Sequence, residues 1–252
     1  MKRKIKRAVA TGMSLAMGTV IMTSDVMVSP VMASQINGEK PYAVELYAAS
    51  NASYNGLYYS TSGSYATITG YDGQSTDIVI PDKIGSYTVN AIQYGAFKDN
   101  NKITSVKIPS TVTQIGNSYG SGAFENCANL KSVSIAAGAE TAYIGNATFK
   151  DCTSLEEITV PGNYTTIYSD AFRGCRSLKK FVYNDNGISR KIQNRAFYEC
   201  TSLVSLSLPT SLNSIGDEAF SGCSSLTAVD IPEGVKLIEY GVFNNCKLLK
   251  KL

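Results

Sequence analysis

The chain has 252 residues, with 23 lysines and arginines against 20 aspartates and glutamates, and it contains neither histidine nor tryptophan. Without histidine, a Ser-His-Asp triad, a Cys-His pair and histidine metal ligands are excluded within this chain. Only 17% of the residues are charged, and Ser, Thr, Asn, Gly and Tyr are plentiful. This composition is typical of a hydroxyl-rich β surface rather than of a coiled coil or a disordered tail.

The first 33 residues have the three-part pattern of a secretory signal peptide. Five Lys and Arg residues between positions 2 and 7 precede an uncharged apolar run over 8–22, and Val31 and Ala33 stand where a signal peptidase reads small residues. The alternative is an uncleaved membrane anchor, but the run is short for a span of about 20 apolar residues. We expect cleavage near Ala33, a secreted or cell-surface location, and no membrane insertion afterwards.

Removal of this segment changes the sign of the net charge. Five of the 23 basic residues and one of the 20 acidic residues lie in 1–33, which leaves 18 and 19 and a net charge of about −1. No electrostatic footprint for nucleic acid remains, so nucleic acid is not an expected partner.

The next segment, residues 34–77, is rich in tyrosine. Its stretch GLYYSTSGSYATITGY, residues 56–71, alternates like a β-hairpin. We expect an N-terminal segment and β cap whose aromatic side chains cover the first coil of the remaining chain. An aromatic binding surface is the alternative.

Seven copies of one repeat fill the remainder, 78–252. An aliphatic residue follows each aligned phenylalanine after six positions, another apolar residue follows after nine, and in six copies an isoleucine precedes it by five. Six copies carry a cysteine three positions after the phenylalanine. The aligned phenylalanines are 23–27 residues apart, at Phe97, Phe124, Phe149, Phe172, Phe197, Phe220 and Phe243.

The repeat predicts a stacked coil. The alternation at Leu206 and Leu208 is that of a strand with one buried face, and a proline ends most of these strands. The AFxxC piece is too short for an independent helix, so we expect one helical or 3₁₀ turn. One coil cannot bury its own apolar edge, whereas seven stacked coils can.

This pattern, with the lead-in YATITGYDGQSTDIVIP, resembles the BspA-like leucine-rich repeat family of bacterial surface proteins. The resemblance covers about residues 78–252 and implies a leucine-rich-repeat solenoid, a right-handed superhelix that is mainly β with short helical or 3₁₀ turns and about seven coils. It also implies a secreted or cell-surface protein associated with adhesion to host or cell-surface proteins or glycans.

The cysteines have two interpretations. Strands stacked about 4.8 Å apart place equivalent Cα atoms within disulfide range, so neighbouring cysteines could be bridged. Because Asn100 takes this position in the first copy, and leucine-rich repeats use Asn or Cys at a turn position, free buried thiols are favoured. One cysteine per coil gives no metal-ligand spacing, and a nucleophilic cysteine lacks a histidine base. The disulfides that the spacing allows are Cys127–Cys152, Cys175–Cys200 and Cys223–Cys246.

Three insertions, over 117–122, 136–143 and 184–191, depart from the repeat. Extra length in a solenoid goes into loops on one face, which are binding loops in some proteins and neutral drift in others. NDNGIS in the third resembles a calcium loop, but Val182 and Gln193 stand where carboxylates are required, so a tight turn is favoured. The sequence stops within a repeat with no visible cap. We expect either that it is a fragment or shortened reading frame, or that a partner covers the last coil, for example through end-to-end self-association.

The outward positions of the predicted strands form the candidate ligand surface. They are small, hydroxylated and of mixed charge, which suits a broad protein or glycan surface and equally suits a merely soluble sheet. The candidate residues are Ser105, Lys107, Ser132, Ser134, Glu157, Thr159, Lys180, Ser205, Ser207 and Asp230, together with Tyr119 in the first insertion.

Three functions are compatible with this sequence. The leading one is a non-enzymatic binding module that needs no cofactor or metal, and the second is a structural spacer or scaffold within a larger surface protein. A hydrolase with paired carboxylates is the third, but no such pair stands outside the repeat pattern, so we do not expect an enzyme.

Overall fold

The computed structural model describes residues 52–251. The chain divides into two units, Met1–Ser50 and Asn51–Leu252, and the described residues all belong to the second. The predicted signal peptide and the start of the predicted N-terminal segment lie outside the described residues.

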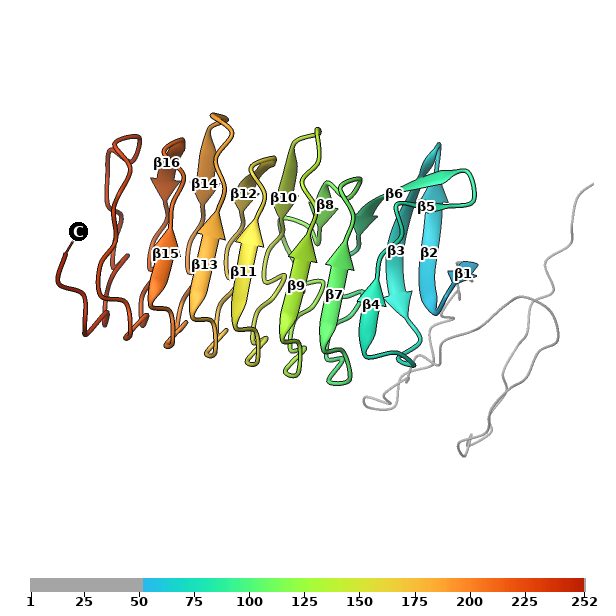
Figure 1. Ribbon diagram of the computed structural model, residues 1–252, viewed down its shortest axis with the longest axis horizontal. Coiled ribbons are helices and arrows are strands. Elements are labelled where there is room, and N and C mark those ends of the chain that lie inside the picture. The colour runs from blue at the N-terminus through green and yellow to red at the C-terminus, as the bar shows by residue number, and fades with distance from the viewer. Residues whose placement is uncertain (1–51, 252) are drawn as a thin grey trace, which may run out of the picture. The chain divides into compact units, whose positions relative to one another are not determined.

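The second unit is a β-solenoid whose coils follow one another along the chain (Figure 1). One parallel sheet has the strand order β15-β13-β11-β9-β7-β4. Its strands are β4 (Asp77–Val79), β7 (Ser105–Ile108), β9 (Ser132–Ile135), β11 (Glu157–Val160), β13 (Lys180–Tyr183) and β15 (Ser205–Ser207).

A second sheet forms the other wall of the coils, in the order β1-β2-β3-β6-β8-β10-β12-β14-β16, with β5 paired to β6. It is parallel from β3 through β6 to β16. Its strands are β1 (Ala52–Tyr54), β2 (Leu57–Ser62), β3 (Tyr65–Tyr71), β5 (Lys83–Ile84), β6 (Tyr87–Ile92), β8 (Gln114–Ile115), β10 (Ala142–Ile144), β12 (Tyr164–Ile167), β14 (Arg190–Ile192) and β16 (Leu212–Ile215).

The repeat pattern accounts for both walls. Strand β11 alternates exposed and buried residues, with Ile158 and Val160 inside, as the period-two alternation predicts. In five coils the isoleucine five positions before the phenylalanine ends a strand of the second wall, as Ile144 and Ile167 do. The predicted solenoid is therefore confirmed, while the second sheet was not predicted.

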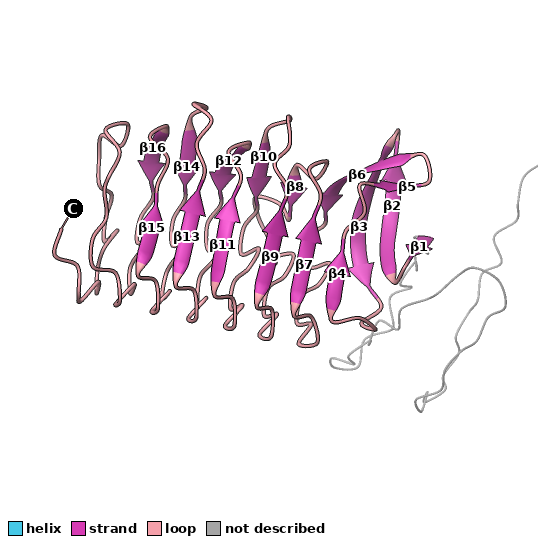
Figure 2. Cartoon of the chain, viewed as in Figure 1, coloured by secondary structure: helices cyan, strands magenta, loops and turns pink. Residues whose placement is uncertain are grey.

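The AFxxC segments are tight turns, and none of the described residues forms a helix (Figure 2). In the second coil the N–H of Cys127 donates to the carbonyl of Phe124 at 3.2 Å, and the N–H of Leu130 donates to the carbonyl of Cys127 at 3.0 Å. These are single i to i+3 hydrogen bonds, the type that the expected 3₁₀ turn uses.

The phenylalanines stack into a continuous column through the interior. Neighbouring rings have centroids 4.7–5.7 Å apart and planes within 17° of parallel, from Phe97 to Phe243. Such offset stacks add to the apolar area that each ring buries. The column thus links each coil to the next through its interior.

Two positions in the coil adopt the left-handed backbone region. The residue two after the phenylalanine has a positive φ in all seven coils, as at Gly174, Glu199 and Gly222, and so does the residue two before it in six coils. Asn, Asp and Gly occupy most of these positions because they tolerate this conformation. In the sequence, the only sign of these left-handed positions is their preference for Asn, Asp and Gly.

We therefore expect Glu199→Gly to raise the free energy of unfolding by about 0.5–1 kcal/mol, because glycine removes the cost of a left-handed Cβ. Its ion pair with Arg176, at 3.4 Å, has both side chains exposed and contributes little. Chemical denaturation measures the change. Ser202→Gly, three residues on and without a positive φ, is the control and is expected to lower stability; equal effects of the two would contradict the prediction.

The described part of the tyrosine-rich segment pairs with the first coil. Strands β2 and β3 form an antiparallel hairpin, and β3 continues in parallel into β6. Leu57, Ala66 and Ile68 of this hairpin join the core, and the ring of Tyr71 lies 5.8 Å from that of Phe97. Tyr65, in contrast, is half exposed.

Candidate functional site

The outer face of the six-stranded sheet carries two rows of side chains in register. Residues of one row pair across neighbouring strands, as Glu157 does with Lys180 and Lys107 with Ser134. Because strands lie about 4.8 Å apart, each row presents one side chain at that interval. The candidate residues placed in these rows are Ser105, Lys107, Ser132, Ser134, Glu157, Thr159, Lys180, Ser205 and Ser207.

The other two candidates lie outside the strands of this sheet. Asp230 is exposed beyond β15, in the last coil, where Lys251 approaches its carboxylate at 3.3 Å. Tyr119 is 74% exposed in the first insertion, which follows β8 of the other sheet. The structure thus brings nine of the eleven candidates together and places Tyr119 apart from them.

Asp77 lies at one end of this face, on β4. The carboxylate of Asp77 accepts hydrogen bonds from the hydroxyls of Ser105 at 2.5 Å and Thr104 at 3.2 Å. Together with a weaker contribution from Lys107, these bonds lower the pKa of Asp77. Lys179 and Glu156 form an exposed ion pair at 2.9 Å beside the rows. The face therefore offers fixed hydroxyls together with a few charges of both signs.

The cysteines form a ladder of free thiols, which confirms the favoured interpretation. Each thiol donates to the carbonyl of the phenylalanine one coil earlier, at 3.1–3.3 Å; Cys175, for instance, donates to Phe149. Burial raises their pKa, to about 12 for Cys127. Asn100, in the same position of the first coil, accepts instead from the N–H groups of Lys102 and Ile103.

Thiol labelling tests this arrangement. At about pH 8 a disulfide reagent should modify Cys246 first, because it is half-buried in the last coil and the other five thiols are fully buried. Unfolding without reductant should release six reactive thiols. Fewer than six would restore the disulfide interpretation.

The third insertion is held by a buried arginine. Arg190 is fully buried, and its guanidinium donates to Asp185 at 3.0 Å, to the carbonyl of Ile188 at 2.5 Å and to the carbonyl of Gly162 in the preceding coil. It also donates to the hydroxyl of Ser211. Hydrogen bonds from Ser211, first of all, and from Thr210 and the Gly187 N–H hold the pKa of Asp185 below its usual range. The loop is therefore fixed on both neighbouring coils.

The other insertions are also bound to neighbouring coils. In the first, the carbonyl of Gly120 accepts from the side chain of Asn146 at 3.0 Å. In the second, the side chain of Asn163 donates to the carbonyl of Glu140 at 3.0 Å and accepts from the N–H of Gly138 at 3.3 Å. The first and second insertions are therefore held in place by hydrogen bonds to the adjacent coil.

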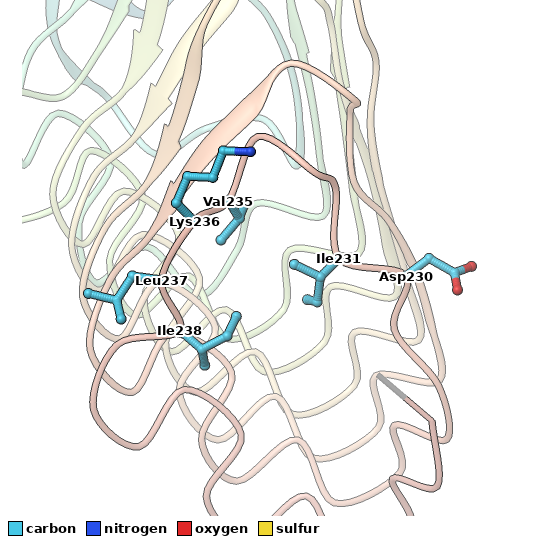
Figure 3. Close-up of a pocket in the computed structure, with 6 residues that line it drawn as sticks. All are labelled: Asp230, Ile231, Val235, Lys236, Leu237 and Ile238. Carbon is cyan, nitrogen blue, oxygen red and sulfur yellow. The ribbon is translucent and has the colours of Figure 1, made fainter.

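The last coil leaves a shallow apolar pocket at its surface. Figure 3 shows Ile231, Val235, Leu237 and Ile238 along it, with the carboxylate of Asp230 directed away. Ile238 is 44% exposed, whereas Ile215, in the same repeat position one coil earlier, is fully buried. Burial of this position depends on a following coil.

Two further features bear on the chemistry. Among residues 52–251, no three potential ligands are grouped as a metal site would need. No helix in this part of the chain could cross a membrane.

Comparison with known proteins places the chain among bacterial repeat proteins. A leucine-rich repeat protein from Bacteroides ovatus ATCC 8483 is 29% identical, with a TM-score of 0.66 over 80% of this chain and 52% of its own. The leucine-rich repeat protein TpLRR of T. pallidum is 25% identical, with a TM-score of 0.52 over 70% of this chain and 90% of its own. The chain thus spans about half the length of the B. ovatus protein.

A comparison with curated proteins finds no match. The sequence pattern of the BspA type leucine rich repeat region, in six copies, matches residues 71–189 and 186–252. These ranges cover well over half of the chain, and the column of phenylalanines and thiols gives the match its physical basis. The chain belongs to the BspA-type leucine-rich repeat family.

Proposed function

We propose that the protein is a secreted or cell-surface, non-enzymatic binding module that contacts host or cell-surface proteins or glycans. The observation that carries the proposal is the pair of in-register rows on the six-stranded sheet. The stacked core holds these side chains at a fixed spacing, so a partner meets a preorganised surface and little ordering entropy is lost on binding. The signal-peptide pattern supports the location.

The composition of the rows favours a broad contact of modest affinity. Most positions are serine or threonine, and the charges of Lys107, Glu157 and Lys180 supply orientation rather than a dominant anchor. Glu157 and Lys180 lie opposite each other on neighbouring strands. Electrostatic pairs at such positions mainly set specificity and association rate.

Binding to immobilised extracellular proteins of cultured epithelial cells tests the proposal. The mature protein should bind saturably, and the double variant Glu157→Ala with Lys180→Ala should weaken binding about tenfold or more. Lys191→Ala, on β14 of the other sheet, is the matched control and should leave binding unchanged. Equal binding by wild type and the double variant would contradict a role for this face.

A spacer or scaffold is the second candidate function. It is favoured by the prevalence of serine on the face, because hydroxyl groups alone keep a sheet soluble without marking a partner. Absence of saturable binding by the wild-type protein would support it. Turnover of a peptide or glycan by the purified protein would contradict both candidates.

A further inference from the structure

Two Asn-Gly pairs lie among residues 52–251, at Asn55-Gly56 and Asn186-Gly187. The backbone nitrogen of such a glycine can attack the side-chain carbon Cγ of the asparagine, because no glycine Cβ hinders its approach. A bond from that nitrogen to Cγ forms, the bond from Cγ to Nδ2 breaks, and ammonia leaves with the proton of the glycine N–H. Water then adds to the resulting cyclic imide and opens it to aspartate or isoaspartate.

Exposure does not distinguish the two pairs, since both asparagines are exposed. The reaction depends instead on whether the glycine nitrogen and the asparagine side chain can leave their places in the folded turn and meet. Hydrogen bonds to either group oppose this movement, and they oppose it most where the partner is itself firmly held.

The turn at Asn186 is held through both reacting groups. The N–H of Gly187 donates to the carboxylate of Asp185 at 2.8 Å. The side-chain oxygen of Asn186 accepts from the N–H of Ile188 at 3.2 Å and from the guanidinium of Arg190, which is fully buried. Attack at Asn186 would have to break these bonds, one of which comes from a buried charge, so this pair is protected.

The turn at Asn55 joins β1 to β2 and has no such ties. Tyr54 pairs with Leu57, so Asn55 and Gly56 are the two turn residues, and their φ angles are 49° and 80°. A turn with two positive φ angles is of the type I′ kind, in which Asn-Gly is the preferred pair. Within the part of the chain that the structure describes, neither the side chain of Asn55 nor the N–H of Gly56 makes a hydrogen bond.

Strand β1 also holds this turn only weakly. It is three residues long, all three residues are exposed, and it is the outermost strand of its sheet (Figure 1). Short exposed elements at the edge of a structure open locally at little cost in free energy. The turn can therefore open and bring the nitrogen of Gly56 to the side chain of Asn55 while the core stays packed.

We propose that Asn55 is a site of spontaneous deamidation and that Asn186 is protected from it. The hairpin requires the reactive pair, because a Cβ on Gly56 would lie 2.9 Å from the carboxylate oxygens of Asp72. The product adds a negative charge next to this glycine, and isoaspartate also lengthens the backbone of a two-residue turn. This modification site goes beyond the proposed binding function and does not depend on it.

Peptide mapping by mass spectrometry, after long incubation of the mature protein at mildly alkaline pH, tests the inference. In the folded protein, Asn55 should convert to aspartate and isoaspartate about tenfold faster than Asn186, or more, because the second turn must break several hydrogen bonds to react. In urea the two asparagines should convert at similar rates, since each then precedes a glycine in an unfolded chain. The ratio between the two conditions measures the protection of each site.

Asn55→Gly is the matched control, because Gly-Gly also suits a type I′ turn. This variant should fold as wild type does and should lose the acidic species that anion-exchange chromatography separates from the aged wild type. Asn55→Asp should elute with the aspartate product. Equal conversion of Asn55 and Asn186 in the folded protein, or an intact Asn55 after the unfolded chain has converted, would overturn the inference. Binding through the sheet face is unaffected by either result.

Discussion

Replacing Phe172 with alanine should lower the free energy of unfolding by about 3–5 kcal/mol. The ring is fully buried, and its centroid lies 5.4 Å from that of Phe149 and 5.1 Å from that of Phe197. Phe181 meets it edge-on at 5.8 Å. Alanine would leave a cavity in the middle of the column that the flanking coils cannot close without losing their own stacking.

The effect should depend on position in the column. Phe243 has the same repeat position in the last coil, is only partly buried, and stacks on Phe220 alone. Phe243→Ala should therefore cost about 1–2 kcal/mol, since less apolar area is lost. Chemical denaturation followed by circular dichroism measures both variants. Equal losses would contradict the column as the source of coil-to-coil coupling, which in a solenoid is a nearest-neighbour quantity.

The buried residues of this fold were well predicted from the sequence, because every coil buries the same repeat positions. Phe220, Cys223 and Leu226 stand at fixed offsets, and all three are fully buried. The alternation at Val106 and Ile108 likewise gave the buried face of the first wall. Seven aligned copies show which positions are always apolar, whereas the residue variation within one short strand would hide this pattern.

The second wall was harder to predict, because its strands are only two to four residues long over most of the solenoid. Gln114–Ile115 is an example, in which a single isoleucine marks the buried face. The left-handed positions were missed because their identity varies, as Asp99 and Glu199 show. A preference for Asn, Asp and Gly two residues after the phenylalanine was the available signal.

The candidate surface was only partly predictable. Period-two alternation placed the outward residues of the strands, but it could not place Tyr119, whose loop lies beside the other sheet. A line of polar side chains on the edge that follows the second sheet, which includes Asp170, Asp217 and Tyr240, was not predicted. Its members occupy variable turn positions, where charged residues usually mark solvated loops. Only the stacking of coils brings them into one line.

Arg190→Met should lower the free energy of unfolding by about 2–4 kcal/mol, because it removes a buried charge that several groups were arranged to pair. The guanidinium joins Asp185, Gly162 and Ser211, which belong to three successive coils. Methionine fills similar space but donates no hydrogen bond. The insertion should lose its fixed position, which protease cleavage at Ile188 or hydrogen exchange across 184–189 would report.

Arg195→Met is the matched control. Arg195 also pairs with a carboxylate, at 2.7 Å to Glu218, but its side chain is 53% exposed, so the expected loss is much smaller than for Arg190. The partner Asp185 adds a pH test, because its pKa is lowered in the folded state. A lowered folded pKa contributes stability above the unfolded value of about 3.9, and that contribution is lost as the pH falls below it.

The stability difference between wild type and Asp185→Asn should therefore be largest near neutral pH and shrink as the pH falls from about 4 toward the lowered pKa. Urea denaturation at a series of pH values measures it. A difference that stays constant across this range would show that Asp185 titrates alike in both states.

Equal losses in Arg190→Met and Arg195→Met would show that the guanidinium of Arg190 is solvated, and the insertion would then be an ordinary surface loop.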